Sequence, residues 1–134
     1  MKKDIKPPVV TDIAVAIVHE AGEDGVMVWN SYLLNMKSET IEGVLVSTKG
    51  YGKKAKETVK TSMLRHFLNI MKPGSFAKIE PIVEDLVGLS NEFWVSFYLN
   101  KVMHDKKYVF MAESIKEQNL IDIPLINKKG VMIK

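Results

Sequence analysis

The stretch Val26-Met-Val-Trp-Asn-Ser-Tyr-Leu-Leu-Asn35, with the following run Ile41-Glu-Gly-Val-Leu-Val-Ser-Thr48, decides the fold class of this chain. Both runs are rich in the β-branched, aromatic and aliphatic residues that favour strands, and a short polar break separates them. The pair therefore predicts a β-hairpin that turns at Asn35–Ser38. The first run carries large apolar groups on both faces, which is typical of a central strand. Gly43 interrupts the alternation of the second run and predicts a bulge.

Alternating apolar residues recur along the rest of the chain and predict further strands. The most regular run is Glu92–Leu99, which we expect to pair with Val102–Met111 through a tight turn at Asn100-Lys101. Residues 61–71 fit helical and strand spacings almost equally, and their position between strands favours a strand. The remaining predicted elements are a strand at Val9–Val18, a strand at Phe76–Val83 with Pro81 indicating an edge, and a short helix at Ser114–Asn119.

These short strands, without any alternation of strands and helices, indicate the fold class. We predict an all-β protein: an immunoglobulin-like, two-sheet antiparallel β-sandwich of about seven strands, with at most one or two short helices. A length of 134 residues is that of a single domain, so we expect one domain over residues 1–134. Within it, residues 1–8 are expected to form a flexible tail. Residues 120–134 are too apolar to stay in water and should pack as an extended segment on the domain or on a second copy.

Composition excludes several classes of function. The chain has no cysteine, which removes thiol catalysis, disulfides and cysteine-ligated zinc. No apolar run approaches the ~18 residues of a membrane span, and the basic N-terminus is interrupted by prolines before a signal-peptide core forms. We therefore predict a cytoplasmic location and no membrane association.

The net charge is +3, but Arg65 is the only arginine, and proteins that read phosphates and bases depend on arginine. A solvated lysine-rich surface is thus favoured over a nucleic-acid face.

No pattern of catalytic or metal-binding residues emerges. The acidic pairs Glu23-Asp24 and Glu84-Asp85 lie in or beside turns, where water keeps both carboxylates ionised, whereas acid–base catalysis needs one of them shifted. The three histidines are not spaced as ligands on one element. Arg65-His66 suggests an anion site, but no acid or nucleophile accompanies it in the sequence. We predict no enzymatic activity, no metal and no cofactor.

Aromatic residues give the best functional lead. Trp94 and Tyr98 share one side of the predicted strand Glu92–Leu99, with Trp29 or Tyr32 expected alongside on a neighbouring strand. If this side faces the other sheet, the rings are core residues, which is the more common arrangement. If the intervening residues fill the core instead, the rings point outward and form a contact surface for a partner or a second subunit.

A lysine-rich segment gives the alternative lead. Residues 49–56 combine flexible glycines, a tyrosine and several lysines, a composition that suits a loop against phosphate or RNA backbone, although it lacks the spacing of a phosphate-binding loop. A solvated loop is the more common interpretation. The residues that would carry nucleic-acid binding are Lys49, Tyr51, Lys53, Lys54, Lys56 and Arg65.

The order of these motifs carries a resemblance. Over about Val26 to Phe110 the chain resembles intracellular and cell-envelope immunoglobulin-like modules, on the motifs Asn35-Met-Lys-Ser38, Val44-Leu-Val46 and Lys72-Pro-Gly-Ser-Phe76. Its whole length is similar to a family of short, uncharacterised bacterial proteins, on the segments Gly43–Gly52, Phe76–Pro81 and Phe93–Phe97. Some members are labelled as phenylalanine tRNA synthetase subunits. Since the chain has no ATP- or amino-acid-binding motif, this resemblance implies an accessory, tRNA-related role at most.

These observations favour a non-catalytic binding module. We expect it to act through an apolar, aromatic sheet face on a protein partner or on a second copy of itself as a homodimer. The alternative is an RNA- or tRNA-associated accessory protein that uses residues 49–56.

Overall fold

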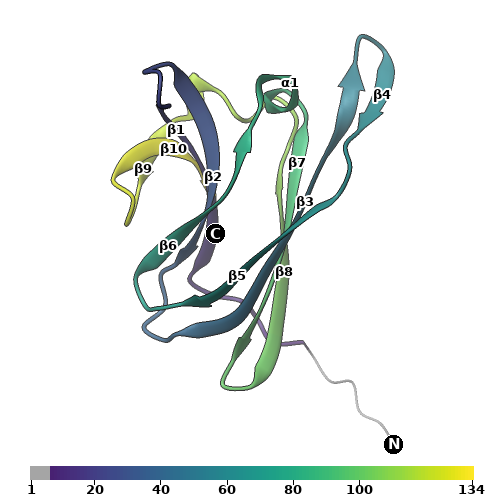
Figure 1. Ribbon diagram of the computed structural model, residues 1–134. Coiled ribbons are helices and arrows are strands. Elements are labelled where there is room, and N and C mark those ends of the chain that lie inside the picture. Colours follow the sequence, from purple (N-terminus) through teal and green to yellow (C-terminus); the bar gives the residue numbers. More distant parts are fainter. Residues whose placement is uncertain (1–6) are drawn as a thin grey trace, which may run out of the picture.

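The computed structural model describes residues 7–134, which form two antiparallel sheets (Figure 1). The predicted all-β, two-sheet architecture is confirmed. The described residues form ten strands rather than about seven: β1 (Ile13–Ala21), β2 (Met27–Asn35), β3 (Ile41–Lys54), β4 (Glu57–Lys60), β5 (Leu64–Met71), β6 (Ser75–Ile82), β7 (Ser90–Leu99), β8 (Val102–Phe110), β9 (Ile121–Ile123) and β10 (Lys128–Ile133). A four-residue helix α1 (Glu84–Val87) and a 3-10 turn η1 (Glu117–Asn119) complete the described elements. Of the predicted tail 1–8, residues 1–6 lie outside the described residues.

Sheet A has the strand order β6-β2-β1-β10-β9, and sheet B has the order β4-β3-β7-β8 with β5 also paired to β3. Along β3, the first part of the strand pairs with β5 and the last part with β4. The β3–β4 hairpin extends beyond the end of the two layers (Figure 1). Among the described residues, no helix has the length and apolar character needed to cross a membrane.

The predicted hairpin between β2 and β3 is wrong, because the two strands belong to different sheets. Asn35 is the last residue of β2, and its side chain fixes the path of residues 36–40, which cross from sheet A to sheet B. Its Nδ2 donates to the backbone carbonyls of Met71 and Lys72, both at 3.1 Å, and to a carbonyl within the connection. These bonds fasten residues 36–40 to the β5–β6 turn, so the chain leaves sheet A and enters sheet B.

Several local predictions are confirmed. Residues 64–71 form a strand, and Asn100 and Lys101 adopt the positive φ angles of a tight hairpin turn. Gly43 has φ +56° at a shift in the β3 register, and β6, which contains Pro81, is an edge strand.

Other boundaries differ from the predictions. The first strand starts at Ile13 rather than Val9, because Asp12 has a positive φ of 58° and ends the extended conformation. Residues 49–56 are not a loop, since β3 continues to Lys54 and turns tightly at Ala55-Lys56. The helix expected at Ser114–Asn119 is reduced to η1.

The main core lies between the sheets. On β7 the alternate side chains of Phe93, Val95 and Phe97 are each only 1% exposed. They meet inward-facing residues of sheet A, including Val15, Ile17 and Leu33. Burial of a side chain of this size stabilises the fold by roughly 1.5–3 kcal/mol, so this set fixes which side of β7 faces inward.

The C-terminal segment packs within the chain. β10 pairs with β1, and β9 pairs with β10 and forms an edge of sheet A (Figure 1). A second apolar cluster forms on the side of sheet A that faces away from sheet B, and it contains Ala14, Ala16, Val18, Leu34 and Ile123. Both faces of β2 are therefore covered, as its apolar pattern predicts for a central strand.

The buried carboxylate of Glu20 ties the C-terminal segment to β1 and β2. Glu20 of β1 accepts hydrogen bonds from Asn30 Nδ2 at 2.8 Å, Tyr32 OH at 2.6 Å and Lys128 Nζ at 2.7 Å. Burial on its own would raise the pKa of Glu20, but the hydrogen bonds from Lys128, Tyr32 and Asn30 outweigh it. The net effect is a pKa below the usual 4.5.

Gly130→Ala should destabilise the protein by about 1–3 kcal/mol, the usual range for overpacking. A Cβ at this position would lie 2.5 Å from the backbone oxygen of Ile17, which can move away only if the β1–β10 pairing is distorted. Urea unfolding measures the loss. The matched control is Gly50→Ala, another strand glycine, whose Cβ would meet its nearest atom at 3.4 Å. Equal stabilities of the two variants would contradict the close approach of β10 to β1.

Glu20→Gln should destabilise the protein by about 1–3 kcal/mol near neutral pH, because the bonded charge is lost. A carboxyl whose folded pKa is depressed contributes its stability above the unfolded value and loses it as the pH falls through the folded value. The difference between wild type and variant should therefore shrink as the pH drops below 4.5. Urea unfolding over this pH range is the measurement. The exposed control Glu39→Gln should change stability by less than about 0.5 kcal/mol throughout.

Candidate functional site

The candidate site is the outer face of sheet B, meaning the side turned away from sheet A. Because Phe93, Val95 and Phe97 point into the core, the alternate residues of β7 point outward. Strand register brings residues of β3, β5 and β8 to the same side. This outer face includes Glu42, Leu45, Ser47, Lys49, Tyr51, Arg65, Phe67, Glu92, Trp94, Ser96, Tyr98, Met103, Asp105 and Lys107.

Large apolar side chains are exposed on this face. Trp94 is 46% exposed, Tyr98 48% and Phe67 67%. Met103 is directly opposite Tyr98 on β8, and Phe67 is opposite Leu45 on β5. The residues are thus neighbours on one sheet surface. The outward alternative for Trp94 and Tyr98, rather than the core alternative, is the arrangement found.

A glycine positions Tyr98. A Cβ at Gly43 would lie 3.2 Å from Tyr98 Cδ1, so the absence of a side chain there lets the phenol ring rest against the β3 bulge. The positive φ of Gly43 makes the same position unfavourable for other residues.

A shallow groove of about 490 Å³ crosses the face beside Trp94. Two serines, Ser47 and Ser96, adjoin the indole on β3 and along β7, and their small size leaves part of its ring open to solvent. The groove is lined by Leu45, Ser47, Lys49, Met63, Arg65, Glu92, Trp94, Ser96, Met103 and Lys107.

Positive charge accompanies the aromatic rings. Lys107 is paired with Trp94 across β8 and β7, and its Nζ lies 5.6 Å from the indole centroid, a cation–π contact. Lys49 Nζ is 3.6 Å from Glu92 Oε2, so the acid of the groove is already neutralised. Arg65 forms no ion pair with any residue of the described range 7–134.

The structure divides the residues singled out in the sequence. Lys49, Tyr51 and Arg65 are predicted from the sequence as part of a separate nucleic-acid site. In the structure they lie on the outer face together with Trp94 and Tyr98. Lys53 continues the line into an adjoining groove of about 550 Å³ at the β3–β4 hairpin. Lys54 ends β3 and Lys56 occupies the turn.

Trp29 and Tyr32 do not join this face, because β2 belongs to sheet A. Trp29 is 9% exposed and stacks on His19 with ring centroids 4.2 Å apart. Tyr32 donates to Glu20 on the far side of sheet A, and burial together with that hydrogen bond raises its pKa to about 12.

Sequence reasoning missed Phe67, Met63, Met103 and Lys107. The alternation within residues 64–71 contains a signal for Phe67, since a strand there places Arg65 and Phe67 together opposite His66 and Leu68. Met103 and Lys107 can be assigned to this face only when the β7–β8 register is known, because that register places them opposite Tyr98 and Trp94.

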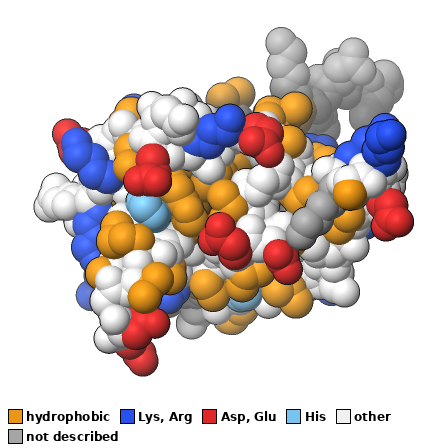
Figure 2. All heavy atoms as spheres, turned by 90° about the horizontal axis from the view of Figure 1, so that it is seen from above, with side chains coloured by type: hydrophobic (Ala, Val, Ile, Leu, Met, Phe, Trp, Pro, Cys, Tyr) orange, Lys and Arg blue, Asp and Glu red, His pale blue; other side chains and the backbone are white. Residues whose placement is uncertain are grey.

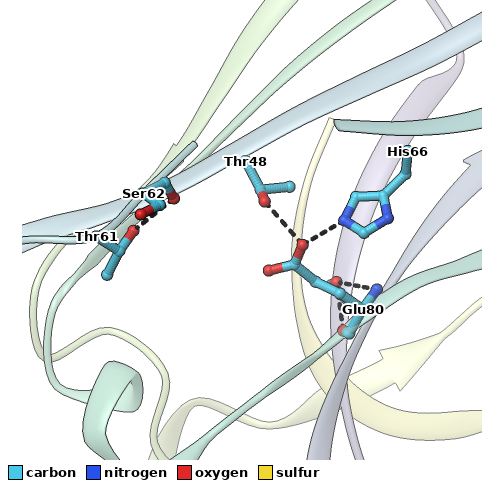
Figure 3. A network of polar contacts seen from close by, with 6 residues as sticks. Thr48, Thr61, Ser62, His66 and Glu80 are labelled. Carbon is cyan, nitrogen blue, oxygen red and sulfur yellow. Dashed lines mark hydrogen bonds and ion pairs between the residues drawn. The ribbon is translucent and has the colours of Figure 1, made fainter. Parts of the chain in front are cut away.

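The polar network around Glu80 is the second constellation, and it joins the sheets (Figure 3). Glu80 of β6 receives a hydrogen bond from Thr48 Oγ1 on β3 at 2.7 Å, and His66 Nε2 on β5 lies 2.5 Å from the same Oε1. Ser31 Oγ donates to the Glu80 carbonyl at 2.7 Å. In Figure 3 the Glu80 carboxylate points toward both Thr48 and His66.

This arrangement is suited to linking strands rather than to nucleophilic catalysis. The Thr48 hydroxyl donates to the Glu80 carboxylate and not to the His66 imidazole, so the hydroxyl–imidazole contact of a Ser/Thr–His nucleophile pair is not formed. Thr61 Oγ1 accepts from Gly50 N at 2.7 Å and donates to the Ser62 carbonyl at 3.2 Å. Thr61 and Ser62 lie to one side of the pair in Figure 3. Within residues 7–134, no three His, Asp or Glu side chains gather as a metal site.

The described residues at the end of the molecule that carries α1 and the β3–β4 hairpin present a mixed surface (Figure 2). Seen from this end in Figure 2, acidic and basic side chains are interspersed among hydrophobic ones, without a field of one sign. The outer face of sheet B therefore remains the principal candidate.

Comparison with known proteins adds no assignment: no family model, no curated protein and no solved structure matches this chain.

Proposed function

We propose that this protein is a non-catalytic binding module whose binding surface is the outer face of sheet B. The observation that carries the proposal is the exposure of Trp94 on a regular sheet, with Tyr98 and Phe67 on the same side. Single exposed apolar residues are ordinary, but a contiguous group bordered by polar residues marks an interaction site. Tryptophan, tyrosine and arginine are also the residues that most often dominate binding energy.

The strand order supports the finer, immunoglobulin-like interpretation of the fold. In the lettering of such domains, β6-β2-β1 follows the order E-B-A, and β5-β3-β7-β8 follows C′-C-F-G. On this view β4, β9 and β10 are additions to a seven-stranded sandwich.

The absence of cysteine suits a reducing compartment, and we place the module in the cytoplasm. The sequence favours a protein partner or a second copy of the chain. The presence of Lys49, Tyr51 and Arg65 on the same face supports the alternative, a nucleic acid.

A photo-reactive phenylalanine analogue placed at Tyr98 should cross-link to a partner in cells of the source organism. The matched control is the same analogue at Phe76, which is 45% exposed, against 48% for Tyr98, but lies on β6 in sheet A. We expect adducts of higher mass from position 98 at several times the yield from position 76. Mass and nuclease sensitivity of the adduct distinguish a protein, a second copy and a nucleic acid. Equal yields at both positions would remove the outer face as the binding surface.

A further inference from the structure

We propose that the outer face of sheet B binds single-stranded nucleic acid, with bases stacked on its aromatic rings and phosphates held by its cations. This inference rests on the proposed function, because it names the chemistry of the partner for the same surface.

The aromatic residues form a stacking platform. Trp94, Tyr98 and Phe67 are exposed on one sheet surface, and the small neighbours Ser47 and Ser96 leave the indole accessible. Every base presents a π-face, so such rings bind single strands without reading a sequence. Each stacked base contributes roughly 1–3 kcal/mol in proteins that use this mode.

Cations flank the platform on both sides. Pairing of strands aligns Arg65, Ser47, Trp94 and Lys107 in one row across β5, β3, β7 and β8. Neighbouring strands are about 4.8 Å apart. The backbone of Lys107 is therefore one strand spacing from that of Trp94, and the backbone of Arg65 is two strand spacings away on the opposite side. A base on Trp94 thus has a cation within reach on either side for its phosphates.

The lining of the groove has a net positive charge, and the acids Asp105 and Glu42 of the same face lie outside that lining, opposite Ser96 and Tyr98. The lining contains three basic side chains, Lys49, Arg65 and Lys107, against the single acid Glu92, which is paired with Lys49. The adjoining groove shares Lys49 and Glu92 and adds Tyr51, Lys53 and Lys60. The two grooves form one continuous track of aromatic and basic residues along β3.

This chemistry favours a nucleic acid over a protein partner. Lysine is depleted from the cores of protein interfaces, and a cation buried there without a partner is costly. Lys107 stands beside the central ring, where an apolar interface would bury it. Phosphates of a bound strand would neutralise Lys107, and Arg65 two strands from the ring, while the bases cover the rings.

The test is binding of a fluorescein-labelled 12-nucleotide oligothymidylate to the full chain, followed by anisotropy and by tryptophan fluorescence. Quenching should arise from Trp94, because Trp29 is buried. We expect Trp94→Ala to weaken binding about tenfold, within the range for loss of one stacked base. Arg65→Gln and Lys107→Gln should each lower the slope of log affinity against log salt by about 0.7. The controls on sheet A, Phe76→Ala and Lys78→Gln, should bind as wild type does.

The outcomes separate this inference from the proposed function. Absence of binding at low salt, equal binding of a 12-base-pair duplex, or binding unaffected by Trp94→Ala would each overturn single-strand recognition. If the cross-linker at position 98 captures only protein and the oligonucleotide does not bind, the outer face is a binding surface but the inference is wrong. Thermal unfolding of each variant verifies its fold, which is expected to persist because the substituted side chains are exposed.

Discussion

The side-chain alternation of β7 is the constraint on which the rest of the structure depends. Phe93, Val95 and Phe97 fill the space between the sheets, and a shift of one residue would turn all three into solvent. At roughly 1.5–3 kcal/mol for each such side chain, that shift would remove most of the stability of an ordinary domain. The outward position of Trp94 and Tyr98 is therefore not adjustable. It follows directly from what the core requires.

Much of the fold was accessible from the sequence because strands and tight turns are local features. The alternation in β7, the turn at Asn100-Lys101 and the bulge at Gly43 depend on residues close to one another in the chain. The path from β2 to β3 is different. Five residues can close a hairpin or cross between sheets, and here the choice rests on contacts from Asn35 to Met71 and Lys72.

The same distinction explains the candidate site. One strand suffices to place Trp94 and Tyr98 on a common side, but their neighbours come from strands whose partners no local pattern reveals. Trp29 and Tyr32 resemble them in the sequence and belong to the other sheet. Conversely, the glycine-rich composition of residues 49–56 suggests a loop, whereas pairing with β4 makes the segment a strand and brings Lys49 and Tyr51 to the outer face.

The edges of the sheets limit how other molecules approach the protein. In sheet A one edge is β6, where Pro81 offers no backbone N–H, and the other is β9, which is only three residues long. In sheet B the edge strand β8 carries Lys106 and Lys107, and Lys106 Nζ donates to the Lys134 carbonyl at 2.9 Å. Charges, prolines and short strands of this kind discourage the addition of a further strand. These three edges are thus guarded against strand addition, whereas β5, which pairs only with β3, carries the exposed apolar side chains of Leu64, Phe67 and Ile70, so a further strand would meet least resistance there.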